Sequence, residues 1–286
     1  MSPESQKQVS PVSTIEQLFQ RLPDLPAIPK AVQDLIASMD DPEADISHIA
    51  DIVRHDPTLT ARALRLANSA QYAGMPQTAS IEKAVTRVGL HALRALIVTS
   101  GLIRAFKLNP DQRLRDFWLH ALVSAGLASQ LAHCAKIEEE VAYIAALMHR
   151  IGILLLSLAE PAKTAAIEEE FAEATPAQRC EAERERIGVD HAAASAELAR
   201  IWNFPAAVRN AMAAYAYPFS PQAGEQAAAV AIASSAASAH LAGKRADEIL
   251  ATISPALLER LSISAGALPD ILAGLPELSA NALDFL

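Results

Sequence analysis

Three histidines are the residues of this 286-residue chain best suited to bind a metal ion. His120, His149 and His191 each stand among apolar residues in a helical pattern, rather than among surface charges. Three imidazoles from three helices could hold a transition metal through their ring nitrogens. Each histidine, taken alone, could equally be a hydrogen-bonded residue of the core, because histidine is intermediate in burial.

Arg150 directly follows His149 and changes the chemistry of that position. A guanidinium has five donors, no acceptor and a fixed positive charge, so it cannot ligate a cation and repels one. Two interpretations follow. In the first, Arg150 pairs with a carboxylate or extends to the surface. In the second, Arg150 and the three histidines line a pocket that holds an anion such as a nucleotide phosphate, because the bidentate guanidinium is well suited to bind phosphate.

The elements that position these residues are predicted to be helices. Hydrophobic residues make up 51% of the chain and charged residues 20%, which excludes a disordered chain. Gly is scarce, Ala and Leu are plentiful, and no strand alternation occurs, so we expect an all-α fold of helices packed on helices. Polar caps predict helix starts at Ser13 (with Glu16), Asp56, Ser80, Asn109, Thr175 and Asp190. Apolar spacing predicts helices over 29–39, 46–54, 57–70, 90–106 and 138–158, the last broken at Gly152.

The charge of the chain is unevenly distributed. The net charge is −9, which disfavours binding to nucleic acid and to anionic membranes. Residues 46–107, however, hold 8 Lys and Arg against 3 Asp and Glu. Within them, 47–70 resembles a helix-turn-helix, and Arg54, Arg62 and Arg65 form a candidate face for a protein or nucleic acid. The acidic chain and the lack of Gly in the turn favour a packed helical pair, so we expect no nucleic acid partner.

Other site types and targeting signals are absent from the sequence. No P-loop, GxSxG or HExxH motif occurs, and Cys134 and Cys180 belong to no CxxC or Cys/His cluster. The polar N-terminus has no apolar signal region, and the uncharged stretch 226–243 is Ala/Ser-rich and reads as a buried helix. We therefore expect a cytoplasmic protein with free thiols and no membrane partner.

A series of short segments carries a family resemblance when read in order along the chain. They are Leu25-Pro26-Ala27-Ile28-Pro29, Asp56-Pro57-Thr58-Leu59-Thr60, Leu64-Arg65-Leu66-Ala67-Asn68-Ser69-Ala70, Ser80-Ile81-Glu82-Lys83-Ala84-Val85, Phe117-Trp118-Leu119-His120, Ala146-Leu147-Met148-His149-Arg150-Ile151-Gly152 and Leu198-Ala199-Arg200-Ile201-Trp202-Asn203-Phe204-Pro205. Together they resemble the HDOD family, the HD-related output domains, which is a branch of the HD superfamily of metal phosphohydrolases. The resemblance implies an N-terminal helical bundle (13–108) packed on an HD-like bundle (109–220). We expect 1–12 to be a disordered lead and 221–286 to pack on the domain as further helices.

Two departures from the superfamily pattern bear on catalysis. The HD superfamily binds metal with a His followed directly by an Asp, and here the second position is Arg150. Where many relatives have a His pair before a Pro, this chain reads Tyr215-Ala216-Tyr217-Pro218. Since this chemistry needs a metal to polarise phosphate and generate hydroxide, we expect a degenerate site with no metal, no cofactor and no enzyme activity.

The resemblance implies a bacterial signal-transduction output module. We expect a non-catalytic regulatory scaffold that contacts a signalling protein. One alternative is a nucleotide or cyclic-dinucleotide receptor that uses the vestigial pocket of His120, His149, Arg150 and His191. A second alternative is a residual metal-dependent phosphodiesterase. The partner, the incoming signal and the oligomeric state stay open.

Overall fold

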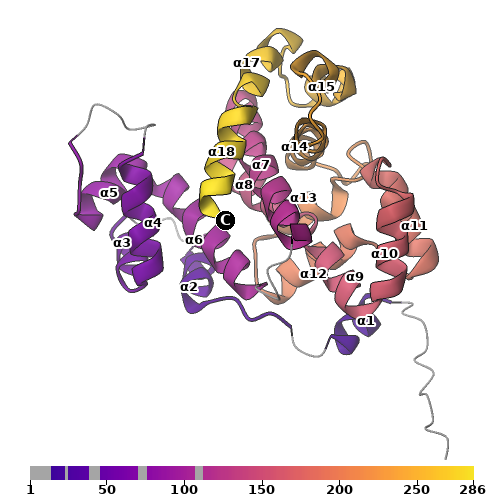
Figure 1. Cartoon of the computed structure of the whole chain (residues 1–286), viewed down its shortest axis with the longest axis horizontal. Coiled ribbons are helices and arrows are strands. Elements are labelled where there is room, and N and C mark those ends of the chain that lie inside the picture. The colour runs from indigo at the N-terminus through magenta and orange to yellow at the C-terminus, as the bar shows by residue number, and fades with distance from the viewer. Residues whose placement is uncertain (1–13, 23–24, 39–45, 70–75, 107–111) are drawn as a thin grey trace, which may run out of the picture.

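The structure is a computed structural model that describes residues 14–22, 25–38, 46–69, 76–106 and 112–286 (Figure 1). Over these residues every regular element is a helix, which confirms the all-α prediction. The predicted lead 1–12 and the caps at Ser13 and Asn109 lie outside the described residues. The first helix, α1 (Ile15–Arg21), is capped by the Thr14 side chain, which accepts from the backbone N–H of Gln17. The predicted cap position was therefore one residue too early.

One group of helices precedes the long helix α7. It comprises α2 (Lys30–Ser38), α3 (Ile46–Arg54), α4 (Pro57–Ala67), α5 (Ile81–Val88) and α6 (Leu90–Ala105). Asp56 caps α4 and Ser80 caps α5, as the sequence predicted. Asn68 at the end of α4 accepts from the backbone N–H of Thr78 and donates to its carbonyl, both at 2.9 Å. This side chain therefore ties α4 to the segment that leads into α5.

A second group of helices carries the three histidines. It comprises α7 (Gln112–Ala135), α8 (Glu139–Met148), α9 (Ile151–Ala159), α10 (Pro161–Glu170), α11 (Pro176–Arg186), α12 (His191–Ile201) and α13 (Ala206–Ala214). Helix α7 packs along α8, and α9 packs on α12. Helix α1 lies against α9 and α12, although it precedes α2–α6 in the chain (Figure 1). The sequence reasoning missed α10, whose charged surface has little apolar periodicity.

The last helices return over the second group. They are α14 (Glu225–Leu241), α15 (Ala246–Thr252), α16 (Pro255–Arg260), α17 (Leu268–Ala273) and α18 (Leu275–Phe285). Helix α14 packs against α7, α8 and α13, and α18 runs along α7 (Figure 1). His240 on α14 is 2.9 Å from the Ser279 hydroxyl on α18. Most α14 residues facing its neighbours are Ala or Ser, so its backbone can approach closely.

The predicted helix 138–158 is broken, but not at Gly152. Helix α8 ends at Met148 and α9 begins at Ile151, so the break falls on His149 and Arg150. Gly152 lies inside α9, where an added Cβ would stand 2.1 Å from the backbone oxygen of His191. Glycine at this position therefore permits the close approach of α9 to α12.

Aromatic residues anchor the core between the two groups. Trp118 and Trp202 are both buried, and Phe106 makes edge-on contacts with each of them at ring centroid distances of 6.4 and 6.0 Å. Both tryptophans are therefore anchors of the core. The stretch Glu139–Ala159 is long and apolar enough to cross a membrane by composition, but it is mostly buried inside the protein.

Candidate functional site

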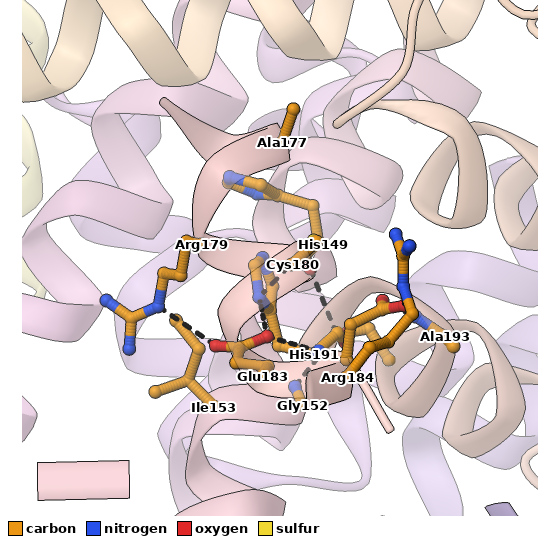
Figure 2. A network of polar contacts seen from close by, with 12 residues as sticks. His149, Gly152, Ile153, Ala177, Arg179, Cys180, Glu183, Arg184, His191 and Ala193 are labelled. Carbon is orange, nitrogen blue, oxygen red and sulfur yellow. Dashed lines mark hydrogen bonds and ion pairs between the residues drawn. The ribbon is translucent and has the colours of Figure 1, made fainter. Parts of the chain in front are cut away.

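His191 belongs to a buried chain of hydrogen bonds that begins at the start of α12 (Figure 2). Its Nδ1 lies 2.6 Å from Glu183 Oε2 on α11, and its Nε2 contacts the hydroxyl of Tyr215. Glu183 also accepts from the backbone N–H of His191 at 2.7 Å and from Nε of Arg179 at 3.0 Å. The carboxylate therefore holds the proton of His191 on Nδ1, and Nε2 accepts from Tyr215.

The carboxyl group of Glu183 is ionised although it is buried. Burial opposes ionisation, but the electrostatic interaction and hydrogen bonds with His191 and the charge of the Arg179 guanidinium outweigh it and hold the pKa of Glu183 below its ordinary value. Burial also raises the pKa of the Tyr215 hydroxyl well above its ordinary value, so this group stays protonated. Glu183 is thus an anion that already accepts hydrogen bonds from His191 and Arg179, and not a free metal ligand.

His120 and His149 meet helix α14 instead of open space. Nδ1 of His149 donates to the Ala146 carbonyl at 2.6 Å, so Nε2 accepts from the Ser234 hydroxyl at 2.9 Å. Nε2 of His120 lies 3.2 Å from the Ser234 carbonyl and 2.9 Å from the Ser238 hydroxyl. The carbonyl fixes Nε2 of His120 as a donor. Two serines of α14 therefore form hydrogen bonds with the Nε2 atoms of both histidines.

Both of these imidazoles are held in the neutral form. Burial lowers the pKa of His120 and of His149 well below the ordinary value, and the nearby positive charge of Arg150 lowers both further. The two rings lie side by side, with centroids 5.8 Å apart. The site therefore has two adjacent neutral imidazoles beside a cation.

Tyr215 stands between this pair and His191. Its ring meets His149 edge-on at a centroid distance of 4.6 Å, and it is 5.8 Å from His191. The three predicted histidines are therefore brought into one cluster, with an aromatic ring interposed. The sequence reasoning identified Tyr215 only as a departure from a family motif. It did not identify Glu183, Ser234 or Ser238, since none of them belongs to a recognisable spacing.

The metal that the HD superfamily uses does not fit these residues. Cys180, Glu183 and His191 place one potential ligand atom each within 4.8 Å of one another. Burial, however, raises the pKa of the Cys180 thiol, and Nδ1 of His191 carries the proton donated to Glu183. His149 has both ring nitrogens in hydrogen bonds and Arg150 as its neighbour, and a guanidinium repels a cation.

Arg150 lines a cavity of about 380 Å³ next to the histidine cluster. Other residues of its wall come from α11, the start of α12, the end of α13, and α14 with the turn after it, among them Arg179, His191, Tyr215, Ser234, Ser235, Ser238 and Lys244. Arg150 is half-buried. Across the residues described, its guanidinium makes neither a hydrogen bond nor an ion pair. The structure therefore presents to this cavity a guanidinium that has no direct carboxylate partner.

Two of the three arginines of the predicted binding face in 47–70 form side-chain contacts within the protein. Arg54 forms ion pairs with Asp51 and, at 2.9 Å, with Glu82. Nη1 of Arg62 donates to the Ser100 hydroxyl at 3.2 Å. Arg65 is exposed. The two carboxylates at Arg54 weaken the positive potential that a phosphate backbone needs.

Comparison with known proteins assigns the family. The model of the HDOD domain matches residues 25–218. The chain belongs to the HDOD family. An uncharacterized protein of Treponema pallidum (strain Nichols) is 28% identical over 193 residues, which are 66% of this chain and 37% of that protein. This chain therefore spans little more than a third of the length of that relative.

Solved structures share the fold over almost the whole chain. A Shewanella amazonensis SB2B protein that bears the name phosphohydrolase has a TM-score of 0.75 and 28% identity. The match covers 93% of this chain and 97% of that one. A Geobacter sulfurreducens HDOD domain protein with unknown function has a TM-score of 0.70 and 22% identity, over 92% and 96% of the two chains. A Marinobacter aquaeolei VT8 protein named for signal transduction has a TM-score of 0.73 and 22% identity, over 94% and 60%. These matches extend beyond residue 218, so the shared fold includes C-terminal helices.

Proposed function

We propose that this chain is a non-catalytic output module of bacterial, cytoplasmic signal transduction, which acts through contacts with a signalling protein. Membership of the HDOD family supports this proposal, and one structural relative carries a signal-transduction name. The family shares its ancestry with metal phosphohydrolases, so the proposal depends on the state of the inherited site.

The observation that carries the proposal is the engagement of the histidines by protein groups. Both ring nitrogens of His149 and of His191 are within hydrogen-bond distance of protein atoms, and Nε2 of His120 faces two serine oxygens. A metal ligand needs a free nitrogen lone pair, and phosphohydrolysis needs the metal. Because Arg150 replaces the acidic ligand and brings positive charge, binding a divalent ion here costs both hydrogen bonds and electrostatic repulsion.

Nucleic acid is a less suitable partner for this module. The chain has a net charge of −9, and Arg54 is paired with two carboxylates. Counterion release requires several basic side chains that are free to contact phosphates. A protein partner needs no such charge excess.

A hydrolysis assay tests the absence of catalysis. The full chain is incubated with a generic phosphodiester and added Mn²⁺ or Fe²⁺, beside a His149→Ala variant. We expect equal background rates for both proteins. Turnover by the parent that disappears in His149→Ala would establish the residual phosphodiesterase and overturn the proposal. An Arg150→Asp variant, which restores the His-Asp pair of the superfamily, shows whether Arg150 alone blocks the reaction.

A further inference from the structure

We infer that the cavity beside the histidines binds a small phosphate-bearing ligand of about mononucleotide size, held by Arg150 with Ser235 and Lys244. The inference rests on the proposed function, because it requires a site that binds this ligand without cleaving it. It gives the module a chemical input in addition to its protein partner.

The Arg150 guanidinium is the main reason for an anionic ligand. It is half-buried, lines the cavity and has no hydrogen-bond or ion-pair partner among the described residues. Taking a charge partly out of water without a partner is costly, so such a group is typically satisfied by a bound anion. A planar guanidinium presents two parallel N–H donors, which match the oxygens of phosphate.

Two further groups of the wall are available to the same ligand. Ser235 on α14 is half-buried, and Lys244 lies in the turn after α14 and is exposed. Within the described part of the chain, neither side chain forms a hydrogen bond or ion pair. Arg150, Ser235 and Lys244 thus offer more donors than the two oxygens of a carboxylate use, whereas phosphate has at least three acceptor oxygens.

The other charges of the wall leave a positive balance. Arg179 is already paired with Glu183 at 3.0 Å and with Glu168 at 3.4 Å. Glu173 also lines the cavity but is exposed to solvent, where its repulsion is screened. The two unpaired cations therefore outweigh the one unpaired carboxylate of the wall.

The size of the cavity selects among phosphate-bearing molecules. Its volume of about 380 Å³ lies near the lower limit of the range for small-molecule sites. A mononucleotide suits this volume better than a cyclic dinucleotide, which has two bases and two sugars. Because residues of α14 and the start of α11 both form the wall, a ligand would join these elements and stabilise the folded state.

Thermal unfolding and calorimetry of the full chain test the inference. The probes are inorganic phosphate, AMP, GMP and cyclic diguanylate at low ionic strength. We expect phosphate and at least one mononucleotide to raise the unfolding temperature, and Arg150→Gln to weaken that mononucleotide at least about tenfold, the loss expected for a charge-assisted hydrogen-bonded contact. Lys244→Ala is expected to weaken it less, because Lys244 is exposed. Arg209→Gln is the matched control, since Arg209 is also half-buried but is not part of the cavity wall.

Several results would overturn the inference. These are no stabilisation by millimolar phosphate or either mononucleotide, tighter binding of cyclic diguanylate than of the mononucleotides, or equal losses in Arg150→Gln and Arg209→Gln. If Arg150→Gln does not fold, the comparison of Lys244→Ala with Arg209→Gln decides, and equal affinities there count against the site. Cleavage of a bound probe would instead contradict the proposed function, so the two failures can be told apart.

Discussion

Replacing Gly152 by Ala tests the close approach that places Arg150 beside the histidine cluster. Gly152 is the second residue of α9, and its N–H donates to the Ser195 hydroxyl on α12 at 2.8 Å. An added Cβ would stand 2.1 Å from the backbone oxygen of His191, where ordinary contacts begin near 3.4 Å. The two helices must therefore separate by about 1.3 Å, because neither backbone can rotate away as a side chain can.

The magnitude follows from the cost of overpacking a dense core. Such insertions cost about 1–3 kcal/mol, and contact with a backbone oxygen in place of a flexible side chain puts this variant at about 3 kcal/mol. Loss of alignment with the Ser195 hydroxyl acts in the same direction. For a chain of this length, that corresponds to a fall in the unfolding temperature of about 5–10 °C.

Urea and thermal unfolding of Gly152→Ala measure this cost, with Gly266→Ala as the control. The nearest atom to a Cβ added at Gly266 is 4.0 Å away, so that variant should retain the parent stability. A loss below about 0.5 kcal/mol in Gly152→Ala, or equal losses in both variants, would refute the packing of α9 on α12 described above.

Two further predictions concern the hydrogen bonds and protonation of the site. The pKa values of His120 and His149 in the folded state lie below the unfolded value of about 6.5. The stability that these two neutral histidines contribute is therefore fully present above about pH 6.5 and is lost as the pH falls. The loss is at most about 1.4 kcal/mol per pH unit for each histidine. Urea titrations between pH 7.5 and 5.5 measure this slope, and a flat profile would contradict it. Tyr215→Phe leaves the acceptor nitrogen of His191 without its donor and should cost about 1–3 kcal/mol, whereas Tyr217→Phe, which removes a half-buried hydroxyl bonded to an exposed arginine, should cost less. The reverse order in chemical unfolding would argue against the buried chain of hydrogen bonds.

Much of the fold was predictable because local signals are strong at the helix ends. Asp56, Ser80, Thr175 and Asp190 each cap the helix that the sequence predicted there. A side-chain acceptor placed before a helical pattern satisfies otherwise unpaired N–H groups, and this requirement depends little on tertiary structure. The break at His149 is different, since it is set by how α9 meets α12.

The site was predictable only in part, for a similar reason. The three histidines and Arg150 could be identified because they stand out from apolar surroundings and from a family motif. Glu183 lies in a helix full of charges, and nothing in the sequence distinguishes it from its exposed neighbours. Ser234 and Ser238 lie in an Ala-rich helix more than a hundred residues from His120, and only the packing of α14 on α7 brings them together. Contacts between residues that are distant in the sequence cannot be predicted from the local spacing of residue types.

The metal content of the purified protein tests the central claim most directly. The chain is prepared without chelators and without a His-tag, and its metal is measured by mass spectrometry beside His149→Ala and the control His240→Ala, which alters a histidine outside the cluster. Because the site nitrogens are engaged by protein groups and Arg150 opposes a cation, we expect far less than one ion per chain in all three proteins. About one ion per chain in the parent and in His240→Ala, lost in His149→Ala, would contradict the account.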